Sequence, residues 1–148
     1  MDDETAQSLA VALLAASRAM VDGVSAGVRV RGFADVRPVH GFAFTIVARG
    51  GATSTQLAEH LGMTRQAAAQ LADELVAKGY LERRLHPLDA RARLLVLTDK
   101  GWACTRAAES AIGDTATAWT AILGADRLRS LAGDLTRLAP DGPLRPIW

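Results

Sequence analysis

The stretch from Thr53 to Thr98 constrains the fold of this chain more than any other part. Two helix patterns joined by a short turn come first, and two strand patterns follow them. Thr53 can cap the first helix, and Gln56 can bond back to it, which completes a capping box. Gly62 suits the left-handed residue that ends a helix, and Thr64 suits the cap of the next helix. The sequence therefore predicts a helix-turn-helix.

The second helix, residues 64–79, has two unlike faces when it is drawn at about 100° per residue. The apolar face must be buried and consists of Ala68, Leu71, Ala72 and Leu75. The opposite face suits base edges, since amides can pair with adenine, arginine with guanine or phosphate, and alanine methyls with thymine. The candidate DNA contacts are Thr64, Arg65, Gln66, Ala67 and Gln70. Asp73 would repel phosphate, so we expect it at the border of the footprint or paired with an arginine. The same residues are ordinary on an exposed helix face, so this helix alone leaves DNA reading open.

A β-hairpin is expected after Gly79, which ends the helix. Residues 80–86 alternate, with Leu81 and Leu85 on one side, and residues 94–97 form a second apolar strand pattern. The connection between the strands is too long for a two-residue turn, so its tip should project from the sheet. The stretch thus predicts a helix-turn-helix with a β-wing.

The wing, residues 86–93, offers a minor-groove contact in Arg91, because narrow A·T-rich grooves attract guanidinium groups. Asp89, two residues earlier, can bond the loop backbone and orient this arginine. Arg84 on the first strand is a further candidate contact. The alternative is that Asp89 and Arg91 only form an ion pair on the surface.

Five short motifs occur together in this stretch: Leu57-Ala-Glu, Leu71 with Leu75, Lys78-Gly-Tyr-Leu-Glu-Arg-Arg84, Pro87-x-Asp89-x-Arg91-Ala92 and Leu97-Thr98-x-x-Gly101. As a set they resemble the MarR family of bacterial transcription regulators. The resemblance implies that the helix after the turn enters the major groove and that Arg91 enters the minor groove. It also implies dimerisation through the N- and C-terminal helices. Many members carry Asp-Arg-Arg in the wing, whereas this chain has Ala90 at the middle position, and its residues 67–69 are all alanine.

Striped helices are expected on both sides of this stretch. Apolar residues recur at three- and four-residue steps from about Glu4 to Val28, and residues 39–48 form a shorter helix after a break at 32–38. Thr98 should cap a long helix that ends at Leu123, and residues 126–138 place leucines at heptad-like spacing. The stripe expected on the long helix is Trp102, Thr105, Ala108, Ile112, Thr115, Trp119 and Ile122.

These stripes are more than one winged domain needs to cover itself, so we expect a two-fold homodimer in which the helices interlock. Such a dimer would read a pseudo-palindromic operator with half-sites about 10 bp apart. An intramolecular bundle is the alternative. The expected fold is mainly α with a small antiparallel β-wing. One MarR-like domain, 1–148, comprises a winged helix-turn-helix at 36–101, dimerisation helices at 1–30 and 102–139, and a tail at 140–148 ending in Trp148.

Charge and composition fit a limited DNA contact. The chain has 148 residues with 49% hydrophobic content, enough for one domain with a core, and a formal charge of only +1. Residues 62–93 carry six Lys or Arg against four Asp or Glu, whereas residues 1–22 carry four acids against one arginine. A local positive excess suits a small footprint on DNA and argues against a general polyanion binder.

The same inventory indicates a cytoplasmic protein that needs no cofactor. The one cysteine, Cys104, rules out an intramolecular disulfide. The acidic start is unlike a secretory signal, and the apolar stretch from Leu9 to Val21 is broken by Arg18 and too short to span a bilayer. His40, His60 and His86 form no metal motif. We expect Cys104 to be a buried structural thiol and not a redox switch. No enzymatic activity and no membrane partner are expected.

The sequence thus predicts a homodimeric regulator that binds double-stranded DNA, with repression relieved by a small aromatic effector. The effector must favour one spacing of the two reading helices over another. Candidate pocket residues are His40, Phe44 and Trp102, which could equally belong to the core. The alternative function is a winged-helix protein-interaction module without DNA reading, which the alanine-rich helix and Ala90 would favour.

Overall fold

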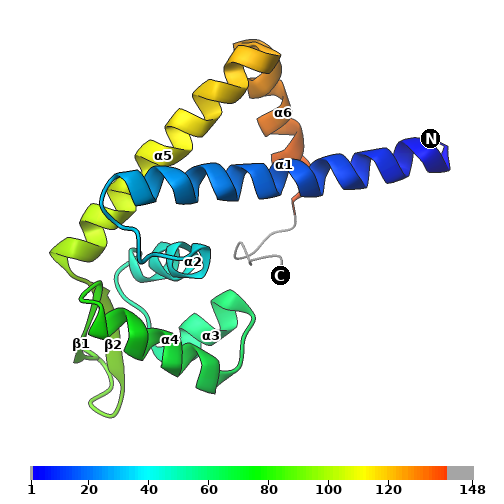
Figure 1. Cartoon of the computed structure of the whole chain (residues 1–148). Coiled ribbons are helices and arrows are strands. Elements are labelled where there is room, and N and C mark those ends of the chain that lie inside the picture. The colour runs from blue at the N-terminus through cyan, green and yellow to red at the C-terminus, as the bar shows by residue number, and fades with distance from the viewer. Residues whose placement is uncertain (1, 140–148) are drawn as a thin grey trace. The chain divides into compact units, whose positions relative to one another are not determined.

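The computed structural model describes residues 2–139, which form six helices and a two-stranded antiparallel sheet (Figure 1). The expectation of a mainly helical winged fold is confirmed. The tail at 140–148, including Trp148, lies outside the described residues. In chain order the elements are α1 (Asp3–Val30), α2 (Pro38–Val47), α3 (Ser54–Leu61), α4 (Arg65–Ala77), β1 (Leu81–Leu85), β2 (Arg93–Leu97), α5 (Asp99–Leu123) and α6 (Ala125–Leu138).

The described residues divide into two compact units. One contains residues 2–35 together with Ala107–Arg137, and the other contains Val36–Arg106 together with residues 138–139. The second unit holds the whole stretch from α2 to the first two turns of α5. We call Val36–Arg106 the winged-helix unit.

In the winged-helix unit, the helices begin and end at the predicted capping residues. The Thr53 hydroxyl accepts the Gln56 N–H at 3.2 Å while the Gln56 side chain accepts the Thr53 N–H at 2.9 Å. Gly62 has φ 67°, and the Thr64 hydroxyl accepts the Ala67 N–H at 3.1 Å. The predicted boundaries of the helix-turn-helix are therefore confirmed. At α2, Pro38 was read as part of the break but is the first helical residue, a position that proline favours. The strands expected at 80–86 and 94–97 are found at Leu81–Leu85 and Arg93–Leu97.

The core of the winged-helix unit is built from side chains of every element around it. Leu57, Leu75, Tyr80, Leu81 and Leu95 are each at most 1% exposed. The Tyr80 and Phe44 rings lie 5.7 Å apart between centroids. The apolar face predicted for α4 is the buried one.

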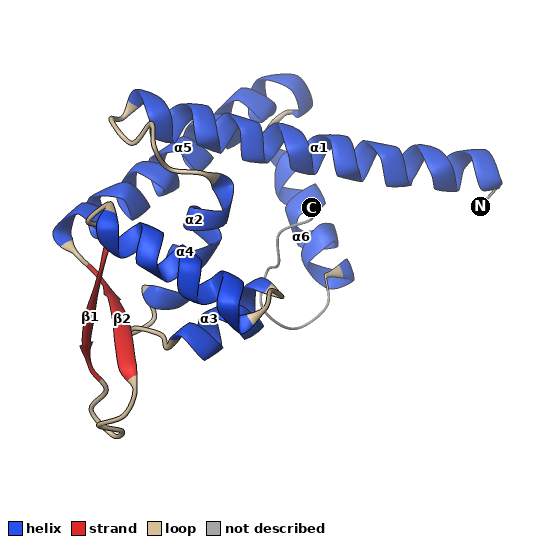
Figure 2. Cartoon of the chain, turned by 60° about the horizontal axis from the view of Figure 1, so that its bottom comes forward, coloured by secondary structure: helices blue, strands red, loops and turns tan. Residues whose placement is uncertain are grey.

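The wing is a regular antiparallel pair. Leu81 is opposite Leu97 and Leu85 is opposite Arg93, and Ala52 adds an isolated bridge to Leu95 through two hydrogen bonds of 3.0 and 2.8 Å. Figure 2 shows the connection between the strands extending away from the helices of this unit. Leu85 was expected to share the buried side with Leu81, yet it is 69% exposed. The reason is that it lies at the outer end of the hairpin, beyond the helices.

In the other unit, α1 packs against α5 through small residues. A Cβ on Gly27 would come within 2.5 Å of the Ala111 Cβ, and one on Gly23 within 2.8 Å of the Thr115 hydroxyl. Arg31 closes the contact with an ion pair of 2.5 Å to Asp114. Close approach of two helix backbones at this point therefore requires glycine.

The stripe expected on α5 lies mostly outside the core of the single chain. The buried positions of α5 include Cys104, Ala107 and Ala111, whereas Trp102 and Ile112 are 41% and 48% exposed. Within its own unit, α1 meets α5 at small side chains, with Gly27 against Ala111 and Gly23 against Thr115. The large side chains of the predicted stripe are left at the surface.

Helix α1 is longer than the apolar run suggested. Its 28 residues have a window of mean hydropathy 1.5, so length and composition alone would let it cross a membrane. That corrects the argument that the stretch is too short. One helix of this kind near the N-terminus is weak evidence of a membrane span, because the core helix of a soluble protein and a signal sequence have the same length and composition.

Candidate nucleic-acid interface

The reading face of α4, the side opposite its buried apolar residues, points outward. Arg65, Gln66 and Gln70 are exposed, and Ala67 and Ala69 are half-buried beside them. Thr64 is also exposed, and its hydroxyl caps α4 by accepting a backbone N–H. Both amides therefore project from one side of a helix whose other side is fixed in the core.

The tip of the wing is ordered by Asp89. Its carboxylate accepts the backbone N–H of Arg91 at 2.9 Å, and its carbonyl accepts the N–H of Ala92 at 3.1 Å. Arg91 is exposed at this tip. The expected bond from Asp89 to the loop backbone is confirmed, and it turns the chain so that the Arg91 side chain leaves the loop outward.

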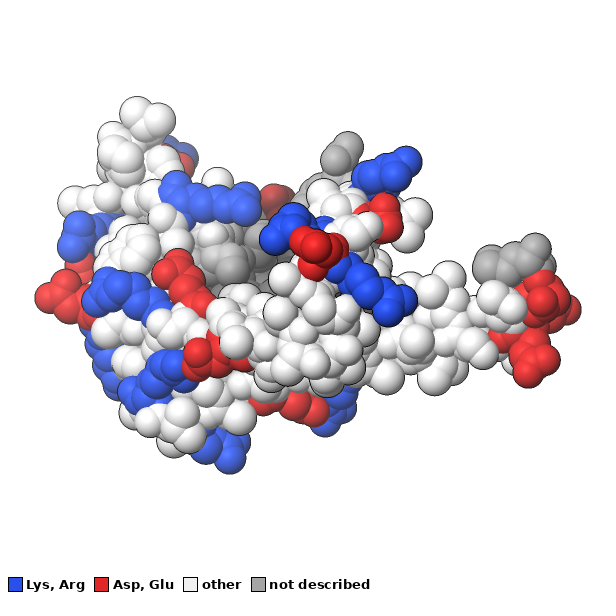
Figure 3. Space-filling view, turned by 90° about the horizontal axis from the view of Figure 1, so that it is seen from above, with Lys and Arg blue, Asp and Glu red and all other residues white. Residues whose placement is uncertain are grey.

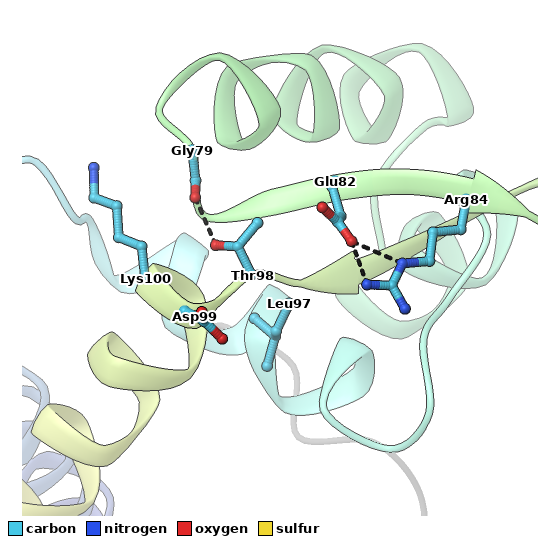
Figure 4. Close-up of a pocket in the computed structure, with 7 residues that line it drawn as sticks. All are labelled: Gly79, Glu82, Arg84, Leu97, Thr98, Asp99 and Lys100. Carbon is cyan, nitrogen blue, oxygen red and sulfur yellow. Dashed lines mark hydrogen bonds and ion pairs between the residues drawn. The ribbon is translucent and has the colours of Figure 1, made fainter.

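The root of the wing is tied to the end of α4. The Thr98 hydroxyl lies 2.6 Å from the carbonyl oxygen of Gly79, to which it donates (Figure 4). The Lys100 ammonium donates to the carbonyl of Lys78 at 2.7 Å and lies 4.2 Å from the centroid of the Tyr80 ring. These contacts hold the hairpin at a fixed position relative to the reading helix.

Arg84 faces a shallow hollow at this root (Figure 4). Its guanidinium bonds the Glu82 carboxylate at 2.5 and 2.7 Å, so part of its charge is already compensated. The hollow is lined by Gly79, Glu82, Arg84, Leu97, Thr98, Asp99 and Lys100. A phosphate at Arg84 would therefore compete with Glu82.

Two neighbouring acids on α4 bind cations from other elements. Asp73 pairs with Arg83 of β1, which meets the expectation that it pairs with an arginine. Glu74 pairs with Arg37 at 2.6 Å and with Lys78 at 2.8 Å. The i, i+4 spacing of Glu74 and Lys78 is visible in the sequence, but the partnership with Arg37, far away in the chain, gives no sequence signal.

The three residues considered for an effector pocket differ in access. His40 is fully buried, Phe44 is 3% exposed and Trp102 is 41% exposed. His40 accepts the Arg37 N–H and lies 3.2 Å from Glu74, and Phe44 packs on Tyr80. A ligand that reached the first two would have to displace core contacts. Between residues 2 and 139, no three His, Cys, Asp or Glu side chains are grouped as a metal site would need.

A helix-turn-helix with an exposed face and an adjoining β-hairpin defines the fold class as a winged helix-turn-helix. The family model described as MarR family matches residues 36–92, which are the core of the winged-helix unit. This part of the chain is thus similar to the MarR family. Members of this family are transcription regulators and not enzymes.

Solved structures share the fold over nearly the whole chain. CouR, described as a transcriptional repressor bound to a 23-mer DNA duplex, is 25% identical with a TM-score of 0.74, covering 93% of this chain and 96% of that one. A mutant of E. coli MarR complexed with operator DNA is 22% identical with a TM-score of 0.70, covering 89% and 94%. YusO of Bacillus subtilis is 19% identical with a TM-score of 0.70, covering 96% and 99%. Among curated proteins, none matches the sequence.

Proposed function

We propose that this protein is a homodimeric, sequence-specific repressor that binds double-stranded DNA. Residues 64–79 lie in the major groove, and the wing, residues 86–93, reaches the adjacent minor groove. The proposal rests on two features that occur together. Gln66 and Gln70 are exposed on α4, and Arg91 is exposed at the ordered tip of the wing. CouR and E. coli MarR are described in complex with DNA, which supports the same use of the fold here.

Replacing Gln66 or Gln70 by alanine is expected to change sequence preference more than total affinity. Each amide can read an adenine edge, and a lost base contact costs about 1–3 kcal/mol at its own position. The measurement is selection of binding sites from a randomised duplex pool by the wild type and each variant. Gln7→Ala, the same substitution at an exposed amide of α1, is the matched control. A uniform loss of affinity across all sequences would contradict base reading.

The dimer proposal rests on apolar side chains that the single chain leaves uncovered. Leu9 and Leu14 of α1 are 50% and 57% exposed, and Ile122 of α5 is 80% exposed. Figure 3 shows uncharged side chains along the N-terminal part of α1 up to its acidic first turn. No residue of α6 is buried, although the helix carries Leu131 and Leu135. A second copy of the chain would cover such faces.

Light scattering after gel filtration, without detergent, is expected to give twice the chain mass of 15.6 kDa. The physical reason is that exposed apolar helix faces associate in water. A stable monomer would contradict the proposal. Protein that stays with lipid vesicles and needs detergent for release would instead favour a membrane role for α1, and would also overturn the cytoplasmic location that we propose.

We further propose that a small aromatic molecule relieves repression. It must bind better to the dimer whose reading helices are spaced wrongly for DNA, since equal affinity for both states shifts nothing. Trp102 is the accessible aromatic candidate, and His40 and Phe44 could join it only after local opening. The competing function, a protein-interaction module, draws its support from Ala67, Ala69 and Ala90.

A further inference from the structure

The reading helix is held from the side by Glu74, whose side chain is about one-third exposed. The Lys78 ammonium, which donates a hydrogen bond to this carboxylate, lowers the pKa of Glu74 below its usual value, with Arg37 adding to the effect and burial opposing it. Glu74 is therefore ionised over the physiological pH range. One carboxylate oxygen lies 2.8 Å from Lys78 Nζ and 3.2 Å from His40 Nε2, and the other lies 2.6 Å from Arg37 Nη2.

His40 connects this carboxylate to the start of α2. Its Nδ1 accepts the backbone N–H of Arg37 at 3.1 Å, and an amide N–H can only donate. The other ring nitrogen, Nε2, lies 3.2 Å from a Glu74 carboxylate oxygen and 3.2 Å from the Arg37 guanidinium, so the ring lies between these two side chains. Because His40 is fully buried, this ring has no room for another position. One rigid side chain thus joins the cap of α2 to the middle of α4.

The contacts of Glu74 with His40 and Arg37 form a clamp between α4 and α2. The position of Glu74 on α4 decides which side chains this clamp orients. Gln70 lies one turn earlier, so both side chains are on the same side of the helix. On the other side of the reading face, Asp73 pairs with Arg83 of the wing. These ion pairs, at two neighbouring positions and to different elements, oppose rotation of α4 about its own axis and add to the hold of its buried apolar face. The direction in which Gln66 and Gln70 point is then fixed before DNA is met.

We propose that Glu74 is a positioning residue for sequence reading, which acts by clamping α4 to α2 through His40 and Arg37. The inference rests on the proposed DNA-binding function. Pre-orientation matters because a side chain must meet a base edge within hydrogen-bond geometry, whereas phosphate contacts tolerate small rotations. Loss of the clamp therefore reduces specific binding and leaves non-specific binding in place.

The test compares two duplexes of equal length: the one that the wild type enriches most from a randomised pool, and a scrambled version of it. Glu74→Gln keeps the size of the side chain but removes the charge that Arg37 and Lys78 bind. The ratio of specific to non-specific affinity is expected to fall about tenfold, the size of a typical single mismatch. A merely structural role would lower the active fraction equally for both duplexes and leave the ratio unchanged.

Two further variants make the result independent of one substitution. His40→Asn retains an acceptor for the Arg37 N–H, but the shorter side chain cannot reach Glu74. The double variant should lower the affinity ratio no more than Glu74→Gln alone, because both substitutions break the same clamp. Asp126→Asn, which breaks an exposed ion pair with Arg129 on α6, is the charge-matched control and should leave the ratio unchanged.

The outcomes separate the two proposals. A wild type that binds both duplexes equally overturns the proposed function, and the positioning role with it. A wild type that discriminates, together with a folded Glu74→Gln protein of unchanged ratio, overturns the positioning role alone. Additive effects in the double variant would likewise show that His40 and Glu74 do not act as one unit.

Discussion

Replacing Arg91 by alanine is expected to weaken DNA binding and to flatten its dependence on salt. Each phosphate neutralised by a cation releases about 0.9 counterion, so one lost charge changes the log–log slope by about one. A two-fold dimer presents Arg91 twice, so the expected change is about two units per dimer. Asp89 holds the backbone of Arg91 at 2.9 Å, so the loop is already shaped for this contact and little ordering opposes it.

The measurement is a titration of wild type and variant at several salt concentrations. Arg129→Ala removes the same charge from α6, where the guanidinium is paired with Asp126, and serves as the control. Equal slopes and affinities for wild type and Arg91→Ala would mean that the wing does not touch DNA. If even the wild type shows no salt-dependent binding, the protein-interaction module becomes the better reading of the fold.

The parts of the fold that the sequence predicts are those decided within a few residues. The capping box of Thr53 and Gln56, the left-handed Gly62 and the buried face of α4 depend on neighbours along the chain. Local rules describe them fully. The reading face followed directly, because a helix with one apolar side leaves the other to solvent.

The features that escaped prediction depend on contacts between distant residues. The spacing of apolar residues did not show which side of α5 meets α1, whereas the close approach at Gly27 places Ala111 there. The clamp of Glu74 joins residues that lie 37 positions apart in the chain. Neither periodicity nor composition contains this information. His40 was considered for a ligand pocket, and its bond to the Arg37 backbone gives it a structural partner instead.

The second large effect is expected at Gly101, the last residue of the motif Leu97-Thr98-x-x-Gly101. It lies in the first turn of α5, directly against the backbone of Tyr80, the residue before β1. A Cβ there would overlap the carbonyl oxygen of Tyr80 and come within 2.8 Å of a Leu97 methyl. Tyr80 is fully buried and its carbonyl accepts the Thr98 N–H at 3.1 Å, so it cannot move aside.

Gly101→Ala should therefore destabilise the protein, although alanine is the better helix former. Overpacking against fixed backbone costs up to about 3 kcal/mol, and the helix gain returns about 1 kcal/mol. The net loss of about 2 kcal/mol corresponds to a melting temperature lower by about 4–8 °C in a chain of this size. Thermal unfolding followed by circular dichroism at one protein concentration measures it, since dimer stability varies with concentration.

Gly113→Ala is the matched control, because it makes the same substitution in the same helix where a Cβ meets nothing within 4 Å. It should raise the unfolding free energy by about 1 kcal/mol, the difference in helix propensity. Opposite signs for the two variants would show that space, and not propensity, sets the requirement at Gly101. If both variants were stabilised, α5 would not lie against Tyr80, and the root of the wing would lose the support that lets Arg91 and α4 bind neighbouring grooves together.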